Sequence, residues 1–189
     1  LTASLTSLAK VKEVAVRAAN TGGLGDPAAR QALAAEIRSS RSELLALANT
    51  TYGERSIFNG TASGAAYDAN GVYLGNSASI IRDVAPSTSI AVNLTGPQIF
   101  GTAGGPVGDV FEVLDRLATA VENGDASAIA TEHTNVDTLT RTVSAATVTC
   151  AVVRPIWSMD ETRPLNMIAV PIGTSAPFVV AQDEKKAFS

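Results

Sequence analysis

The sequence predicts an α+β protein: an antiparallel helical hairpin or bundle with a small antiparallel β region inserted between its helices. Apolar residues recur at helical spacing over about the first fifty residues and again from Asp109. Between these two parts, short β-branched segments alternate with Gly, Asn and Pro. The hydrophobic content is 46% but aromatic residues make up only 5%, which suits closely packed, alanine-rich helices. A length of 189 residues fits one domain or two small ones.

Residues 1–50 are predicted to form a helical hairpin. The first apolar stripe has the three- and four-residue spacing of one helix face: Leu1, Leu5, Leu8, Val11, Ala15 and Ala18. Glycines follow Asn20 and end this helix. Asp26 and Pro27 then supply an N-cap and a first helical residue. The second helix is predicted to end near Asn49, so that the pair is antiparallel.

Residues 51–108 are predicted to form the small β-rich region. Strand candidates occur at 56–58 and 80–84, and apolar residues alternate over 90–94. Asn70-Gly71 indicates a two-residue hairpin turn. Because an isolated hairpin is only marginally stable, we expect three to five short strands that pack on the helices.

Residues 109–142 are predicted to form a helical pair that completes the helical domain. Asp109 caps its first helix, Asn123-Gly124 ends that helix, and Asp125 begins the next. Beyond Thr142 the periodicity stops, and 143–189 is predicted to be a divergent tail of short strands or irregular chain. Its residues 147–153 are rich in β-branched side chains, and four prolines prevent any long helix: Pro155, Pro164, Pro171 and Pro177.

Composition excludes several classes of partner. The formal net charge of −4 argues against nucleic acid and against an anionic membrane surface, since both attract clustered Lys and Arg. No apolar run of about 18 residues is present to span a membrane. No signal peptide is visible at the start of the sequence.

Residues able to do chemistry are scattered, so we predict no catalytic, cofactor-binding or metal-binding residue. His133 has no partner at ligand spacing, and Cys150 has no basic neighbour before Arg154. The glycine-rich stretch 101–108 lacks the Gly-Lys-Ser/Thr ending of a phosphate-binding loop. Residues 68–71 resemble the start of a calcium loop without its closing Glu, so a turn is the better interpretation.

Three stretches, in order, carry a family resemblance. Residues 30–37 (RQALAAEI), 43–50 (ELLALANT) and 57–62 (IFNGTA) resemble bacterial flagellar hook-associated protein type 3, the hook–filament junction protein of the flagellin superfamily. Residues 68–75 (DANGVYLG), 92–96 (VNLTG) and 109–117 (DVFEVLDRL) resemble its continuation. The resemblance covers about residues 1–140.

The resemblance implies a non-enzymatic structural subunit without cofactors. Such a protein is exported to the extracellular flagellum without a cleaved signal peptide and stacks helically between hook and filament. The implied partners are further copies of itself, flagellin, the first hook-associated protein and an export chaperone, and neither nucleic acid nor membrane.

Two departures from the family pattern lead to further expectations. The family's N-terminal assembly segment does not precede Leu1, and the tail after Thr142 does not resemble the family's returning C-terminal helix. One hypothesis is a truncated or frame-shifted product. The first helix would then lack a packing partner, and Leu5 and Leu8 would be partly exposed.

Three alternatives stay open. A flagellin filament subunit shares the early helices. A secreted adhesin or phage-tail-like module would need exposed aromatic residues in the β region, where five are available: Tyr52, Phe58, Tyr67, Tyr73 and Phe100. A hydrolase would need His133 within reach of a serine or of Cys150.

Overall fold

A computed structural model describes residues 1–20, 26–85 and 88–153. The helices are α1 (Thr2–Asn20), α2 (Pro27–Ala48), α3 (Gly96–Phe100), α4 (Val110–Asn123) and α5 (Ala126–Val153). The strands are β1 (Thr51–Tyr52), β2 (Arg55–Ser56), β3 (Ile81–Ala85) and β4 (Thr88–Ala91). They form two separate two-stranded antiparallel sheets, β1-β2 and β3-β4. The predicted α+β class is therefore confirmed.

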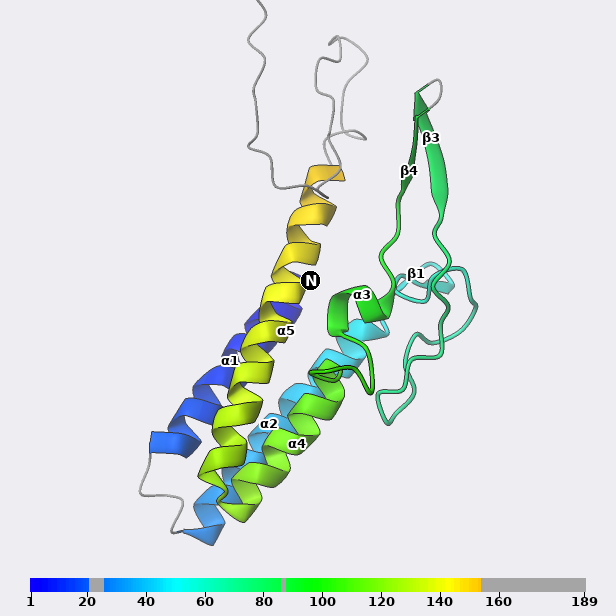
Figure 1. Ribbon diagram of the computed structural model, residues 1–189. Helices are drawn as coiled ribbons and strands as arrows, with labels where there is room; N and C mark the ends of the chain where they lie inside the picture. The colour runs from blue at the N-terminus through cyan, green and yellow to red at the C-terminus, as the bar shows by residue number, and fades with distance from the viewer. Residues whose placement is uncertain (21–25, 86–87, 154–189) are drawn as a thin grey trace, which may run out of the picture.

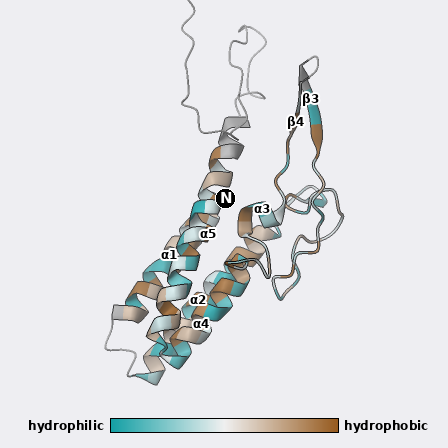
Figure 2. Ribbon diagram, viewed as in Figure 1, coloured by the Kyte–Doolittle hydropathy of each residue, from teal (hydrophilic) through white to brown (hydrophobic). Residues whose placement is uncertain are grey.

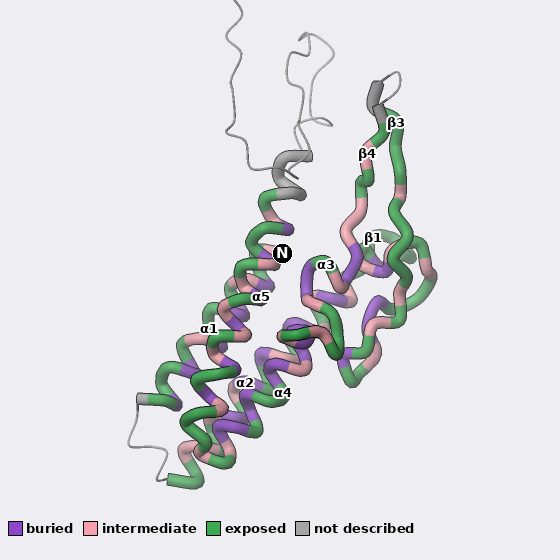
Figure 3. Tube along the Cα trace, viewed as in Figure 1, coloured by how far each residue is buried: buried purple, intermediate pink, exposed green. Residues whose placement is uncertain are grey.

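The four long helices form an elongated bundle, and the β region extends from one end of it (Figure 1). Helix α1 packs on α2 and α5, and α4 packs on the same two helices, so α2 and α5 stand at opposite corners. Buried and exposed residues alternate along each long helix (Figure 3), and each carries both polar and apolar residues (Figure 2). The largest buried side chains of the bundle are aliphatic, apart from Phe111 where α4 begins: Leu8, Val11, Val14, Ile37, Leu44, Leu114, Leu117 and Ile129.

The ends of α2 and α4 lie at the capping residues that the sequence predicts. Asp26 accepts a hydrogen bond from the Ala28 amide, and Pro27 follows as the first helical residue. Asp109 accepts from the amides of Phe111 and Glu112 at 2.8 and 2.9 Å. Gly124 ends α4 in the left-handed conformation, at φ 69°.

Ion pairs join each pair of neighbouring helices. Arg17 meets Glu36 between α1 and α2, and Lys12 meets Asp137 between α1 and α5. The other two seams carry three more: Arg38–Glu122, Arg41–Asp115 and Arg116–Glu132. Arg17–Glu36, Lys12–Asp137 and Arg38–Glu122 are partly exposed, and exposed ion pairs contribute about 0–1 kcal/mol each. Arg41 and Glu132 are the more buried members of the other two pairs.

The β region differs from the prediction in two ways. The turn at Asn70-Gly71 is a three-residue loop, because the Asp68 amide donates to the Val72 carbonyl. The β3-β4 hairpin does not pack on the helices but projects away from them (Figure 1), with Ile81 56% exposed. The two strands pair with one another in antiparallel register, so their backbone groups form hydrogen bonds within the hairpin. The hairpin therefore forms without packing against the helices.

Helix α3 was not predicted. Thr95 and Gln98 form a capping box, and Pro97 occupies an early helical position where its missing amide hydrogen costs nothing. This turn places Ile99 and Phe100 in the core with no exposed surface.

Helix α5 corrects the prediction that order ends near Thr142, since it continues to Val153. Val143 and Ala146 are buried in the core, and α5 packs along α1. The threonine hydroxyls bond back to carbonyls four residues earlier, for example Thr147 to Val143 at 2.9 Å. The remainder of the predicted tail, including its prolines, lies outside the described residues.

Because α5 covers α1, the expected exposure of Leu8 is wrong. Leu8 is completely buried, while Leu5 is partly exposed as expected.

Candidate functional site

The residues considered for catalysis are not brought together. His133 lies half-buried on α5, and within the described residues its imidazole makes no hydrogen bond. Cys150 also belongs to α5, but its side chain lies outside the described part. No group of three or more His, Cys, Asp and Glu in the described ranges could hold a metal ion. None of the described helices is long and apolar enough to cross a membrane.

In and next to the glycine-rich stretch 101–108, backbone amides donate to carboxylates of the protein itself and are not available to a phosphate. Glu112 Oε2 accepts from the amides of Gly104 and Asp109 at 3.2 and 3.3 Å. Asp109 occupies the N-terminus of α4, and burial raises the pKa of its carboxyl above the usual value. Two acidic side chains therefore take the amide donors that an anion would need.

Asp68 likewise serves a turn. Its Oδ1 accepts from the amides of Asn70 and Val72, both at 2.8 Å. Gly71 completes the loop at φ 88°, and Tyr67 pairs with Tyr73 on either side of it. These contacts form a hairpin turn.

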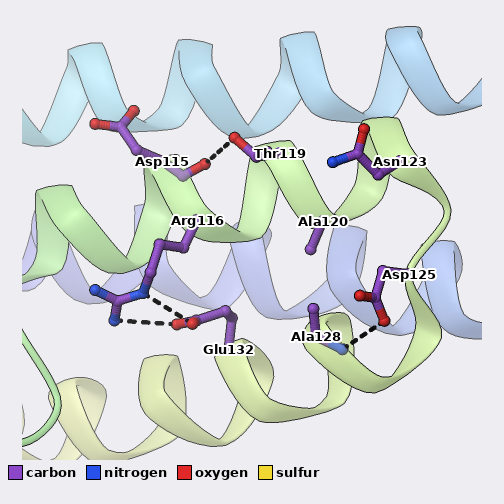
Figure 4. Close-up of a pocket in the computed structure, with 8 residues that line it drawn as sticks. All are labelled: Asp115, Arg116, Thr119, Ala120, Asn123, Asp125, Ala128 and Glu132. Carbon is purple, nitrogen blue, oxygen red and sulfur yellow. Dashed lines mark hydrogen bonds and ion pairs between the residues drawn. The ribbon is translucent and has the colours of Figure 1, made fainter.

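A shallow groove runs between α4 and α5 (Figure 4). Arg116 Nε donates to Glu132 Oε1 at 2.8 Å across it, and a second guanidinium nitrogen of Arg116 donates to the Val107 carbonyl at 2.7 Å. Glu132 also accepts from Asn135, and Ala120 and Ala128 line the groove. Asp115 pairs with Arg41 of α2, and Asp125 accepts from the amides of Ser127 and Ala128. Since each of its charged groups already has a partner, the groove is a seam between helices.

Two of the stretches that carried the family resemblance, 43–50 and 57–62, contribute residues to the joint between bundle and β region. Asn49, just past the end of α2, donates to the Tyr67 carbonyl at 3.0 Å and accepts from the Tyr67 amide at 2.9 Å. Asn59 is fully buried and donates to the carbonyls of Ser63 and Gly64. The side chains of both asparagines thus hold backbone groups of neighbouring segments in place. The sequence motifs 43–50 and 57–62 did not by themselves reveal this role.

Four of the five aromatic residues counted for a binding surface pack inside this joint. Tyr67 lies at its centre, with ring centroids of Tyr73, Phe100 and Phe111 at 5.2, 6.0 and 5.0 Å. Phe58 meets Phe100 edge-to-face at 5.7 Å. Only Tyr52, which is 87% exposed, is left for an outside ligand. The joint is therefore a structural core rather than a platform for glycans.

Two of the exposed helix faces carry mostly small, uncharged residues. On α2, small exposed residues recur at heptad spacing, and we call them the α2 face: Ala28, Ala32, Ala35, Ser39, Ser42 and Ala46. On α5 the same spacing gives the α5 face: Ser127, Thr131, Thr134, Thr138, Arg141, Ala145 and Val148. Arg141 is the one charged residue in the two sets. They lie at opposite corners of the bundle.

Comparison with known proteins gives no match to a family model and no match in sequence to a characterised protein. Solved structures do match. FlgL of Xanthomonas campestris aligns over 87% of this chain and 88% of its own, with a TM-score of 0.70 at 17% identity. FlgL of Bacillus cereus aligns over 81% and 76%, with a TM-score of 0.55 at 22% identity.

A third structure, described as a flagellar hook-associated protein of Vibrio parahaemolyticus, aligns over 80% of this chain and 73% of its own. Its TM-score is 0.57 at 22% identity. This chain has the fold of the flagellar hook-associated protein FlgL.

Proposed function

We propose that this chain is a structural subunit of the bacterial flagellum that acts at the junction between hook and filament. The observation that carries the proposal is the alignment of the fold with FlgL. The fold aligns over 87% of this chain and 88% of the FlgL chain. The sequence motifs at 43–50 and 57–62, which resemble the same family, supply Asn49 and Asn59 to the joint of this chain. The proposed location is the extracellular flagellum, reached by export without a cleaved signal peptide.

The proposed mode of action is side-by-side packing of copies through the α2 and α5 faces. Small side chains let helices approach closely, and nearly uncharged faces lose little hydration when they are covered. Because the two faces differ and lie on opposite corners, the α2 face of one copy meets the α5 face of the next. A head-to-tail contact of this kind continues around a ring or helix.

Flagellin and the first hook-associated protein are the proposed neighbours along the axis, and an export chaperone is the proposed partner before assembly. The protein acts by these contacts and not as an enzyme. The runner-up is a flagellin filament subunit. The two alternatives differ in whether the chain forms filaments alone or only binds the ends of filaments made by flagellin.

The test is sedimentation of the purified chain with and without preformed flagellin filaments and fragments of the first hook-associated protein. We expect the chain to sediment with these partners, and the amount bound to filaments should be proportional to the number of filament ends. Formation of long filaments by the chain alone would favour the flagellin alternative, and no binding to either partner would overturn the proposal.

Matched variants test the packing faces. Ala35→Glu and Thr134→Glu each place a charge on one face, and we expect both to reduce co-sedimentation. Ala9→Glu and Thr6→Glu make the same changes at exposed positions of α1 and should leave co-sedimentation unchanged. Thr6 and Thr134 each bond to the carbonyl four residues earlier, so the two threonine variants lose the same local contact. Equal losses from all four would contradict the assignment of the faces.

A further inference from the structure

We propose that Arg41 is a positioning residue that latches the β region to the bundle and so fixes the direction in which the region projects. The element it holds is the loop 67–73, which the Tyr67–Tyr73 bridge closes. This inference concerns the single chain and does not depend on assembly.

Arg41 contacts three parts of the molecule at once. It lies on α2, and its side chain is only 14% exposed. Its Nη2 donates to the Asn70 carbonyl at 2.6 Å, and its Nε forms an ion pair with Asp115 of α4 at 2.9 Å. The guanidinium carbon lies 5.7 Å from the centre of the Phe111 ring. The planar guanidinium makes these contacts together, which a lysine ammonium cannot do.

The loop depends on this contact because little else polar holds its tip. At its base the Tyr67 backbone is clamped by Asn49. At its tip Gly71 lies directly on Phe111, a contact that a hydrogen bond does not lock. The hydrogen bond from Arg41 to Asn70 is charge-assisted and therefore stronger than a neutral one. Among the described residues, this hydrogen bond ties the tip of the loop to the bundle.

Arg38 provides a matched comparison on the same helix. One turn earlier on α2, it forms a two-pronged ion pair with Glu122 of α4, including Nη2 to Oε2 at 2.8 Å. Like Arg41 it joins α2 to α4, but this ion pair does not involve the β region. Replacing either arginine by alanine thus removes an ion pair between α2 and α4, but only replacing Arg41 also removes the hydrogen bond to the loop.

Arg41 therefore adds a charged contact at the loop tip to the Asn49 clamp and the aromatic joint that also hold the β region to the bundle. Asp115, which is 54% exposed, holds the guanidinium in place and acts through Arg41 rather than on the loop itself. Without the latch, we expect the loop tip to leave Phe111 and the β region to sample several angles about Asn49.

The experiment measures the angle and the loop separately in the full chain. Spin labels at Ala65 and Ala130, both exposed, report the distance between the β region and α5 after Cys150→Ser removes the native thiol. Amide hydrogen exchange at Gly71 and Val72 reports the loop. We expect Arg41→Ala to broaden the distance distribution and to speed exchange at these amides about tenfold, while amides in the centre of α4 are unchanged.

Arg38→Ala should leave both readouts at their wild-type values. Arg41→Lys keeps the charge, so its distance distribution and exchange rates should lie between those of the wild type and of Arg41→Ala. If the alanine variant does not fold, the lysine variant is measured in its place. Wild-type distances and exchange in a folded Arg41 variant would overturn the proposal. Equal effects from Arg38→Ala and Arg41→Ala would also overturn it, because the ion pair between the helices would then be the cause.

Discussion

Replacing Gly71 by alanine tests whether close contact between the β region and α4 stabilises the joint. Gly71 adopts a φ of 88°, and a Cβ built on it would lie 2.6 Å from the Cβ of Phe111. That atom sits next to the helix backbone and cannot swing aside as the end of a flexible side chain can. The new methyl group must therefore push the loop off the helix.

Gly64 offers a closely matched control. It has the same φ of 88°, but nothing lies within 4 Å of a Cβ built there. Alanine at either position carries the strain of a positive φ, about 1–2 kcal/mol. Only Gly71→Ala adds the overlap with Phe111, which costs about 1–3 kcal/mol more on the scale of overpacked cores. We expect a total loss of about 2–5 kcal/mol in the free energy of unfolding for Gly71→Ala.

The assay is urea unfolding followed by far-ultraviolet circular dichroism for the helices and near-ultraviolet circular dichroism for the aromatic joint. Linear extrapolation gives the free energy of unfolding of each variant. We expect Gly71→Ala to lose its near-ultraviolet signal at lower urea than Gly64→Ala does. If the two variants are equally stable, the contact between Gly71 and Phe111 does not stabilise the joint, and the reasoning is refuted.

Three further predictions concern the same region. Tyr67 buries its hydroxyl without a hydrogen-bond partner among the described residues, so Tyr67→Phe should be neutral or stabilising in urea unfolding. The Tyr73 hydroxyl lies 3.0 Å from the carbonyl oxygens of Phe58 and Asn76 and shares its one hydrogen between them, so Tyr73→Phe should cost about 1 kcal/mol. Burial raises the pKa of Asp109 above its usual value, so its contribution to stability is largest at low pH and is lost as pH rises through the folded pKa. Asp109→Asn, which cannot ionise, should therefore gain stability relative to wild type as pH rises above about 4, and a constant difference would contradict this. Replacing residues 80–92 by a short glycine linker should shift the thermal midpoint by less than about 2 °C, because the β3-β4 hairpin projects from the rest, and a larger loss would mean that it supports the fold.

Much of the helical frame could be predicted because its determinants are local. Asp26 and Pro27 begin α2, and Gly124 ends α4, through contacts within a few residues along the chain. The apolar stripe of α4 follows from its spacing in the same way.

Features that depend on distant partners could not be predicted in this way. Helix α5 continues past Thr142 although β-branched residues disfavour helix, because Val143 and Ala146 bury themselves in the core as α5 packs along α1. The same packing buries Leu8.

Only the fold could bring Asn49 to Tyr67 and Arg41 to Asn70. The amino-acid pattern was enough to establish where the bundle helices begin and where the β region lies, since caps, turns and periodicity act over neighbouring residues. How the β region is clamped to those helices depends on contacts between residues far apart along the chain, and periodicity carries no information about them.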